Sequence, residues 1–217
     1  CLYFAGQMNG TSGYEEAAAQ GLIAGANAAL RLLKKEPIIL NRNQAYIGVL
    51  IDDLITKDIN EPYRMFTSRA EHRLSLRSDN AAIRLTERAL VAGLITNKQY
   101  SIFSKYRNSV NEIKRLCKKT LISTNGKKVF LPNYLKRPEC SIYDEGVDKN
   151  IIKNHSHESI FTAETDIEYE GYVKIENMRV KKIKKMDFIK IPKNFDYNSI
   201  PNLSLESREK FIGVLPE

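Results

Sequence analysis

The feature that most constrains this chain is a glycine-rich turn that leads directly into a long, alanine-rich helix. Residues 2–5 are apolar and predict a buried strand, and residues 6–13 contain three glycines and predict a tight turn. A helix is then expected over about residues 14–35, with Ser12 and Glu15 spaced as a capping box. Glycines let backbone N–H groups approach a phosphate, and a helix N-terminus adds partial positive charge there. The unit therefore indicates either a phosphate-binding turn or a plain strand-to-helix connection in an α/β protein.

The remaining sequence predicts helices more often than strands. Residues 97–119 give the clearest amphipathic helix, because an apolar stripe lies opposite a basic face. The stripe consists of Phe103, Tyr106, Val110, Ile113 and Leu116, with Cys117 beside it in a packing role. A helix at 80–91 is expected to end at Gly93. The other expected elements are an ambiguous segment at 44–57, a partly extended segment at 61–77, a hairpin turn at Asn125-Gly126, loops and short helices at 132–165, a basic helix at 168–186 and a short helix at 204–212.

The chain is basic, and its charge is unevenly distributed. It has 34 lysines and arginines against 26 acidic residues, which gives a net charge of +8. Residues 104–140 hold ten basic and two acidic groups, residues 172–193 hold eight and two, and residues 141–171 between them hold two and eight. Two basic blocks separated by an acidic one indicate either a polyanion-binding surface or the solvated faces of helices.

Composition excludes several classes of protein. The chain has no run of eighteen apolar residues, so no membrane-spanning segment and no membrane partner are expected. Its three cysteines, at positions 1, 117 and 140, match neither a disulfide framework nor a zinc-ligand spacing, which fits a reducing compartment. Because the sequence begins with Cys1 and not methionine, and the expected strand follows at once, we expect the chain to be a fragment that starts within a domain.

Three runs of sequence together resemble one family of enzymes. The runs are residues 5–28, AGQMNGTSGYEEAAAQGLIAGANA; residues 45–54, AYIGVLIDDL, followed by 61–71, EPYRMFTSRAE; and Asp79-Asn80-Ala81 with Arg84-Leu85-Thr86. They are similar to the late signature of the bacterial and organellar tRNA uridine 5-carboxymethylaminomethyl modification enzymes, the MnmG or GidA family. Residues 169–172 and 191–201 resemble the downstream helical part of that family, whereas residues 118–165 match it poorly.

The resemblance implies a mainly α fold, in which a helical C-terminal domain follows the terminal strand–turn–helix of an α/β FAD-binding domain. Residues 1–95 would form the end of the FAD-binding domain and a connecting segment, and residues 96–217 a truncated helical domain that binds tRNA and a partner. The implied activity is that of an FAD- and NADH-dependent enzyme that works with the GTPase MnmE. Together they would add a carboxymethylaminomethyl or aminomethyl group to C5 of the wobble uridine. Methylenetetrahydrofolate as one-carbon donor, a homodimer and a cytoplasmic location (mitochondrial for an organellar parent) complete the expectation.

The resemblance also implies that the glycine-rich turn closes the FAD site, with Gln7 as the leading candidate for contact with FAD. Gly6, Asn9, Gly10 and Thr11 are secondary candidates, and Asn9 and Thr11 equally suit turn formation and capping. No catalytic residue and no metal ligand are expected in this chain, because the family's NADH-binding segment and reactive cysteines lie upstream. The fragment alone is therefore expected to be inactive.

Candidates for contact with tRNA come from the arginines of the second run, because a guanidinium group suits phosphates and stacks on bases. These candidates are Arg64, Arg69, Arg73 and Arg77. Their alternative role is structural pairing with Glu61, Glu71 and Asp79. Further electrostatic contacts are expected from Lys114, Lys118, Lys119, Lys181, Lys182, Lys184 and Lys185. The alternative function is a non-catalytic helical RNA- or partner-binding module, and a third is a general flavin oxidoreductase.

Overall fold

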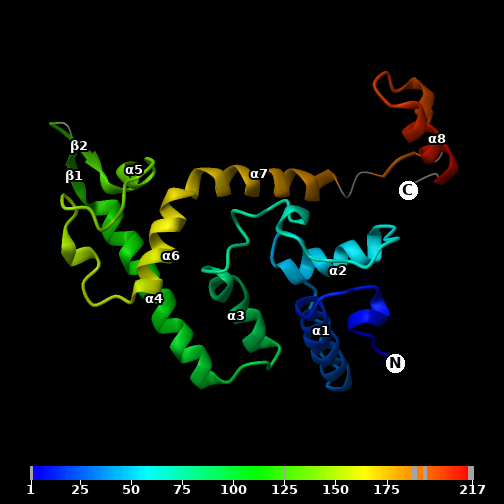
Figure 1. Cartoon of the computed structure of the whole chain (residues 1–217), viewed down its shortest axis with the longest axis horizontal. Coiled ribbons are helices and arrows are strands. Elements are labelled where there is room, and N and C mark those ends of the chain that lie inside the picture. Colours follow the sequence, from blue (N-terminus) through cyan, green and yellow to red (C-terminus); the bar gives the residue numbers. More distant parts are fainter. Residues whose placement is uncertain (1, 125, 187–189, 193–194, 215–217) are drawn as a thin grey trace. The chain divides into compact units, whose positions relative to one another are not determined.

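The structure is a computed structural model, and it describes residues 2–124, 126–186, 190–192 and 195–214. Helices dominate it (Figure 1). The elements are α1 (Tyr14–Leu32), α2 (Tyr46–Thr56), α3 (Ala81–Val91), α4 (Asn97–Lys119), β1 (Leu121–Thr124), β2 (Lys127–Phe130), α5 (Leu131–Leu135), α6 (His157–Glu168), α7 (Glu170–Met186) and α8 (Leu205–Val214). In the described part of the chain the two short strands form the only sheet, so the prediction of a mainly α fold is confirmed.

The chain divides into two compact units, Cys1–Glu176 and Asn177–Glu217. In the second unit, the ring of Tyr197 stacks on Phe211 with centroids 5.6 Å apart and meets Phe195 edge-on at 5.2 Å. Phe211 belongs to the predicted short helix, which is α8, so this small aromatic cluster joins α8 to the 3₁₀ turn Tyr197–Ser199. Across the described residues, no helix combines the length and the apolar character needed to cross a bilayer.

The glycine-rich start of the first unit differs from its prediction. Residues 2–5 form no ladder with any described strand, and the Leu2 side chain is 78% exposed. Because a strand is stable only beside a hydrogen-bonded neighbour, the predicted buried strand is wrong for this part of the chain. The 3₁₀ turn Gly6–Asn9 follows, and Gly10 then takes a left-handed φ of 79°. The predicted tight turn is therefore confirmed.

Helix α1 begins without the predicted capping box. Its N-cap is Gly13, and the Ser12 hydroxyl instead donates to the carbonyl oxygen of Tyr63 at 3.4 Å. The capping prediction is wrong because Ser12 contacts a distant segment instead of the first turn of its own helix. The helix ends at Leu32, earlier than predicted, and Lys34 beyond it takes a left-handed φ of 54°.

The ambiguous segment and the extended segment pack beside α1. Residues 46–56 fold as α2, which packs against α1 and buries Val49 and Leu50. Gly48 allows the preceding loop to approach, since a Cβ there would lie 2.4 Å from the carbonyl oxygen of Asn41. Residues 61–77 contain no strand, only an isolated bridge at Tyr63 and a 3₁₀ turn.

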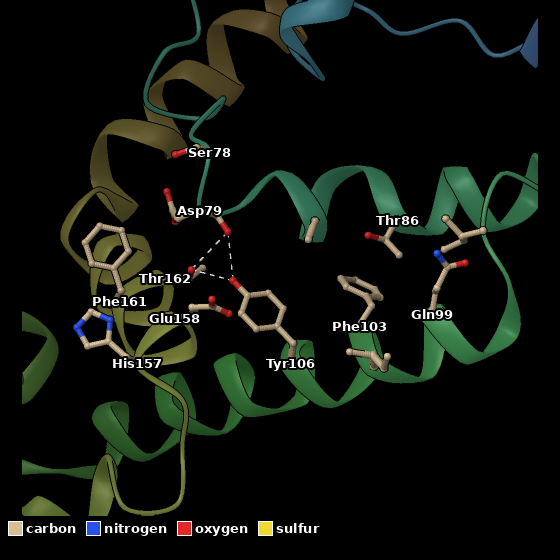
Figure 2. Close-up of a pocket in the computed structure, with 13 residues that line it drawn as sticks. Ser78, Asp79, Thr86, Gln99, Phe103, Tyr106, His157, Glu158, Phe161 and Thr162 are labelled. Carbon is tan, nitrogen blue, oxygen red and sulfur yellow. Dashed lines mark hydrogen bonds between the residues drawn. The ribbon is translucent and has the colours of Figure 1, made fainter. Parts of the chain in front are cut away.

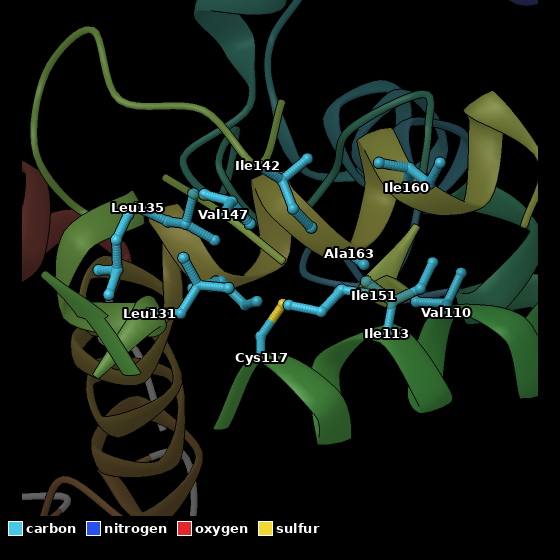
Figure 3. Close-up of a cluster of buried hydrophobic side chains, with 12 residues drawn as sticks. Val110, Ile113, Cys117, Leu131, Leu135, Ile142, Val147, Ile151, Ile160 and Ala163 are labelled. Carbon is cyan, nitrogen blue, oxygen red and sulfur yellow. The ribbon is translucent and has the colours of Figure 1, made fainter. Parts of the chain in front are cut away.

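The helical half of the first unit is built around α4. A complete capping box between Thr96 and Gln99 starts this helix, and its apolar stripe packs mainly against α6. The main core gathers side chains from α4, the hairpin, α5 and α6 (Figure 3). Ile113 and Cys117 are completely buried in it, and burial raises the pKa of the Cys117 thiol to about 11. The predicted amphipathic helix and the packing role of Cys117 are confirmed.

Two further local predictions hold. Helix α3 covers the expected range and is followed by Gly93 at φ 76°. Strands β1 and β2 pair antiparallel, with Leu121 opposite Phe130, and Gly126 turns between them at φ 74°. Asn125, the other residue of the predicted hairpin turn, lies outside the described residues.

Candidate cofactor-binding turn and arginine cluster

The glycine-rich turn is clamped by Tyr63, a residue distant in sequence. The Tyr63 N–H donates to the Gly10 carbonyl oxygen at 2.7 Å, and the Ser12 N–H donates to the Tyr63 carbonyl oxygen at 3.1 Å. These two bonds form a short parallel bridge between Thr11 and Tyr63. The path of the turn is therefore fixed by residues 61–71, which belong to the second of the sequence runs that resemble the family.

Inside the turn, the amide of Gln20 connects three of the predicted cofactor-binding residues. Its Oε1 accepts the N–H of Gly6 at 3.2 Å and the Nδ2 of Asn9 at 2.7 Å. Its Nε2 donates to the Thr11 hydroxyl at 2.9 Å. Sequence analysis missed Gln20, although Glu16 and Gln20 share one face of α1, four residues apart in an alanine run, and both are buried.

Glu16 ties α1 to the segment that carries Tyr63. Its Oε1 accepts the Met65 N–H at 2.6 Å, and this bond, more than the nearby Arg64, holds the pKa of the carboxyl below its usual range. Its Oε2 is buried without a hydrogen-bond partner in the described chain. A Cβ at Gly13 would lie 1.8 Å from that oxygen, so a larger residue where α1 begins would displace the Glu16 carboxylate.

A cluster of charged side chains, the Arg42 cluster, holds the end of α2 against the residues that follow Tyr63. Arg42 contacts Asp53 at 2.5 Å, Asp52 at 2.9 Å and Glu71 at 2.6 Å. Asp53 is completely buried and also contacts Lys57 Nζ at 2.7 Å. Adjacent Asp52 and Asp53 thus bind one guanidinium group, an arrangement that no local sequence pattern marks.

The cluster shifts the acidities of its members. Burial alone would raise the pKa of Asp53, but hydrogen bonds from Lys57, Arg42 and Tyr63 outweigh burial and lower it. The Tyr63 hydroxyl donates to Asp53 at 2.9 Å, and burial together with this carboxylate raises the pKa of Tyr63. On its ring face, Tyr63 carries the guanidinium of Arg69 at 4.5 Å from the ring centroid. Tyr63 is therefore fixed at its backbone, its hydroxyl and its ring.

A hollow of about 600 Å³ lies beside the turn. Four of the five predicted cofactor-binding residues line it, and Gly6, which is buried, does not. The full lining comprises Gln7, Asn9, Gly10, Thr11, Ser12, Leu54, Lys57, Ile59, Asn60, Glu61 and Pro62. The turn therefore shares one site with the end of α2 and the loop that follows it.

The available groups in this hollow fit a nucleotide cofactor such as FAD. Gln7 has an exposed side chain, and its amide can both donate and accept hydrogen bonds. The space where a Gly10 side chain would stand is open, with nothing within 4 Å. Gly6, Asn9 and Thr11 are instead engaged by Gln20, so they build the turn, and Gln7 and Gly10 are the members free to meet a ligand.

The four predicted tRNA-binding arginines fall into two environments. Arg77 is 13% exposed and pairs with Asp79 at 3.0 Å and with Asp166 at 2.6 Å. Arg69 lies on the Tyr63 ring and donates to the Arg64 carbonyl oxygen at 2.9 Å. Both side chains therefore hold other parts of the described chain in place. For Arg77, the partner Asp79 is one of the acids that the sequence predicts.

Arg64 and Arg73 are exposed to solvent. Arg64 lies 3.9 Å from Glu15, a distance at the limit of an ion pair. Glu71, another of the three acids proposed as partners for these arginines, binds Arg42 instead. Among the lysines, Lys114 pairs with Asp166 at 2.9 Å, which removes it from the set of unpaired cations.

These features define a class: a mainly helical chain that begins with a clamped glycine-rich turn and continues into a helical domain. Comparison with known proteins gives the family. The model of the family Glucose inhibited division protein A (GIDA) matches residues 1–36. Proteins named tRNA uridine 5-carboxymethylaminomethyl modification enzyme MnmG are 46% identical in Karelsulcia muelleri, over 99% of this chain, and 43% identical in Enterococcus faecalis, over all of it.

A solved structure agrees with these relatives. GidA of Aquifex aeolicus, in its form II crystal, matches 98% of this chain with a TM-score of 0.74 and 37% identity. The chain spans only 36% of the length of the Karelsulcia relative and 35% of the Aquifex chain. The chain belongs to the GidA (MnmG) family and corresponds to about a third of such a protein.

Proposed function

We propose that this chain is the C-terminal portion of an FAD- and NADH-dependent enzyme that modifies the wobble uridine of tRNA. With a GTPase partner of the MnmE type, the enzyme adds a carboxymethylaminomethyl or aminomethyl group to C5 of the base, using methylenetetrahydrofolate as the one-carbon donor. A homodimer and a cytoplasmic location (mitochondrial for an organellar parent) belong to the same proposal. The support is that almost the whole of this chain is similar to part of proteins with that name.

The observation that carries the proposal is the clamped turn beside the hollow. Gln7 and the open space at Gly10 lie at its surface, while Gln20 and Tyr63 hold the backbone from behind. A preorganised turn lowers the entropic cost at which an amide carried on it binds the edge of a ligand. When bound, FAD would supply hydride-transfer chemistry, and Gln7 would orient it.

The rest of the chain would contribute to binding tRNA. Arg64 and Arg73 are the exposed members of the arginine set, and Lys118 and Lys119 are exposed at the end of α4. Contacts of this kind neutralise phosphates, so binding would weaken steeply with salt. The same contacts would suit a non-catalytic RNA-binding module, so the decisive test is the chemistry on the base.

That test uses a chimera in which this chain replaces the matching third of the Enterococcus faecalis MnmG. The chimera is expressed in a strain that lacks its own enzyme, and wobble nucleosides of total tRNA are measured by liquid chromatography and mass spectrometry. The proposal expects modified uridine to return, and to be lost in the chimera with Arg64→Ala and Arg73→Ala. A folded chimera that leaves the uridine unmodified would contradict it.

A further inference from the structure

A second, larger hollow lies away from the glycine-rich turn, between α3, α4 and α6 (Figure 2). Its volume is about 850 Å³, within the range of small-molecule sites. Its apolar lining includes Phe103, Ile102 and Phe161, the last two being 64% and 51% exposed. Because two large apolar side chains from different helices remain exposed at one opening, this hollow presents an unfilled apolar surface.

The polar end of the hollow is a hydrogen-bonded triad. The Tyr106 hydroxyl donates to the Asp79 carbonyl oxygen at 3.1 Å and lies 2.8 Å from the Thr162 hydroxyl, which itself lies 3.4 Å from the Asp79 carbonyl (Figure 2). The triad has two O–H donors, and both are satisfied within it. A ligand can therefore form hydrogen bonds with this triad only by donating to the remaining lone pairs of its oxygens.

Charge at this hollow has one sign. Glu158, in the first turn of α6, is exposed and lies beside Tyr106 in Figure 2. The carboxylate of Asp79 is directed to Arg77. The described residues that line the hollow include no lysine or arginine, and its one imidazole, His157, stacks on Tyr143 with ring centroids 6.4 Å apart. An anionic ligand is therefore disfavoured, and a cationic donor is favoured.

We propose that this hollow binds an aromatic ring that carries a protonated amine. The ring would lie against Phe103, and the ammonium group would donate to the triad and to Glu158, on the side of the hollow where the face of Phe161 also attracts a cation (Figure 2). Three independent features agree on this class: apolar aromatic walls, an end that only accepts, and a single unpaired carboxylate. The site is separate from the cofactor-binding turn and does not depend on the function proposed for it.

Because the sequence contains no tryptophan, an indole compound can serve as a fluorescent probe without background from the protein. Indole emission from tryptamine, excited beyond the tyrosine band, then reports the probe alone, and its fluorescence anisotropy rises on binding to the 217-residue chain. The expected dissociation constant is about 1 mM or below, in keeping with a ligand of this size. Indole-3-propionate, which has the same ring and the opposite charge, is expected to bind at least about tenfold more weakly.

Two variants test the assigned contacts. Glu158→Gln and Phe161→Ala should each weaken tryptamine about fivefold. Their matched controls, Glu145→Gln and Phe130→Ala, change exposed residues of the same type away from the hollow and should leave affinity unchanged. Circular dichroism verifies that all four variants keep their helices.

The proposal is overturned by any of three results: no rise in the anisotropy of dilute tryptamine as the chain is titrated to about 1 mM, equal affinity for indole-3-propionate, or unchanged affinity in both hollow variants. Weakening by the control variants to the same degree would also overturn it, because the probe would then bind elsewhere.

Discussion

Replacing Arg42 by methionine removes the central cation of the Arg42 cluster while keeping an unbranched side chain. Asp53, which is completely buried, would lose its contact at 2.5 Å and keep only Lys57 and Tyr63. Removing one partner of a buried pair costs about 3–5 kcal/mol. Because Arg42 is itself 22% exposed and Asp53 keeps two partners, we expect the lower end, about 3 kcal/mol. That corresponds to about a 150-fold shift toward the unfolded chain.

The same variant has a defined pH dependence. The cluster lowers the pKa of Asp53, and although burial opposes it, the bonds from Arg42 also lower the pKa of Glu71. A carboxyl with a lowered folded pKa contributes stability above its unfolded pKa, about 3.9 for Asp and 4.3 for Glu, and loses it as pH falls through the folded value. The difference between wild type and Arg42→Met should therefore be complete at pH 7 and shrink below about pH 4.

Urea unfolding followed by circular dichroism at pH 7 and at about pH 3 measures both effects. The control is Arg115→Met, since Arg115 is 58% exposed and 4.0 Å from Glu112, and it should change the free energy of unfolding by less than about 0.5 kcal/mol. A loss of less than about 1 kcal/mol for Arg42→Met at pH 7, or a loss that does not shrink in acid, would refute the role assigned to the cluster.

Three further predictions follow from burial. Ile113→Ala empties a completely buried site in the main core and should lower the free energy of unfolding by about 3 kcal/mol in urea, and a change below about 1 kcal/mol would contradict the packing described. Gly13→Ala places a Cβ 1.8 Å from Glu16 Oε2 and should cost about 2 kcal/mol in thermal unfolding, unless Glu16 is shortened to alanine at the same time. In the native chain at pH 8, Cys117 should resist a thiol reagent while the half-buried Cys140 reacts, and equal rates would show that the core opens readily.

The helices were predictable from sequence where the signal is local. The apolar stripe that predicts α4 lies within that helix, and the glycine that predicts the end of α3 directly follows it at Gly93, and both helices form as expected. The strand at residues 2–5 was not predictable in the same way. An apolar run becomes a strand only if another strand lies beside it, and the described chain supplies none.

The candidate site was predictable only in part. The glycine pattern identified the turn, and the family resemblance proposes Gln7 as a contact for the cofactor, but the groups that hold the turn were missed. Gln20 contacts residues nine to fourteen positions earlier, and Arg42 contacts an acid 29 positions later. Pairings at such separations depend on the folded path, and no periodicity in the sequence encodes them.

Flavin content measures most directly whether the opening residues close a cofactor pocket. The chimera that carries this chain in place of the matching third of Enterococcus faecalis MnmG is purified, and its FAD per polypeptide is determined from visible absorbance after denaturation. We expect about one FAD in the parent chimera, a large loss with Gln7→Ala, and no loss with Asn111→Ala, an exposed amide of α4 outside the turn. A folded Gln7→Ala chimera that retains full FAD content would contradict the role proposed for Gln7, and a folded parent chimera that binds no FAD would contradict the account of the turn itself.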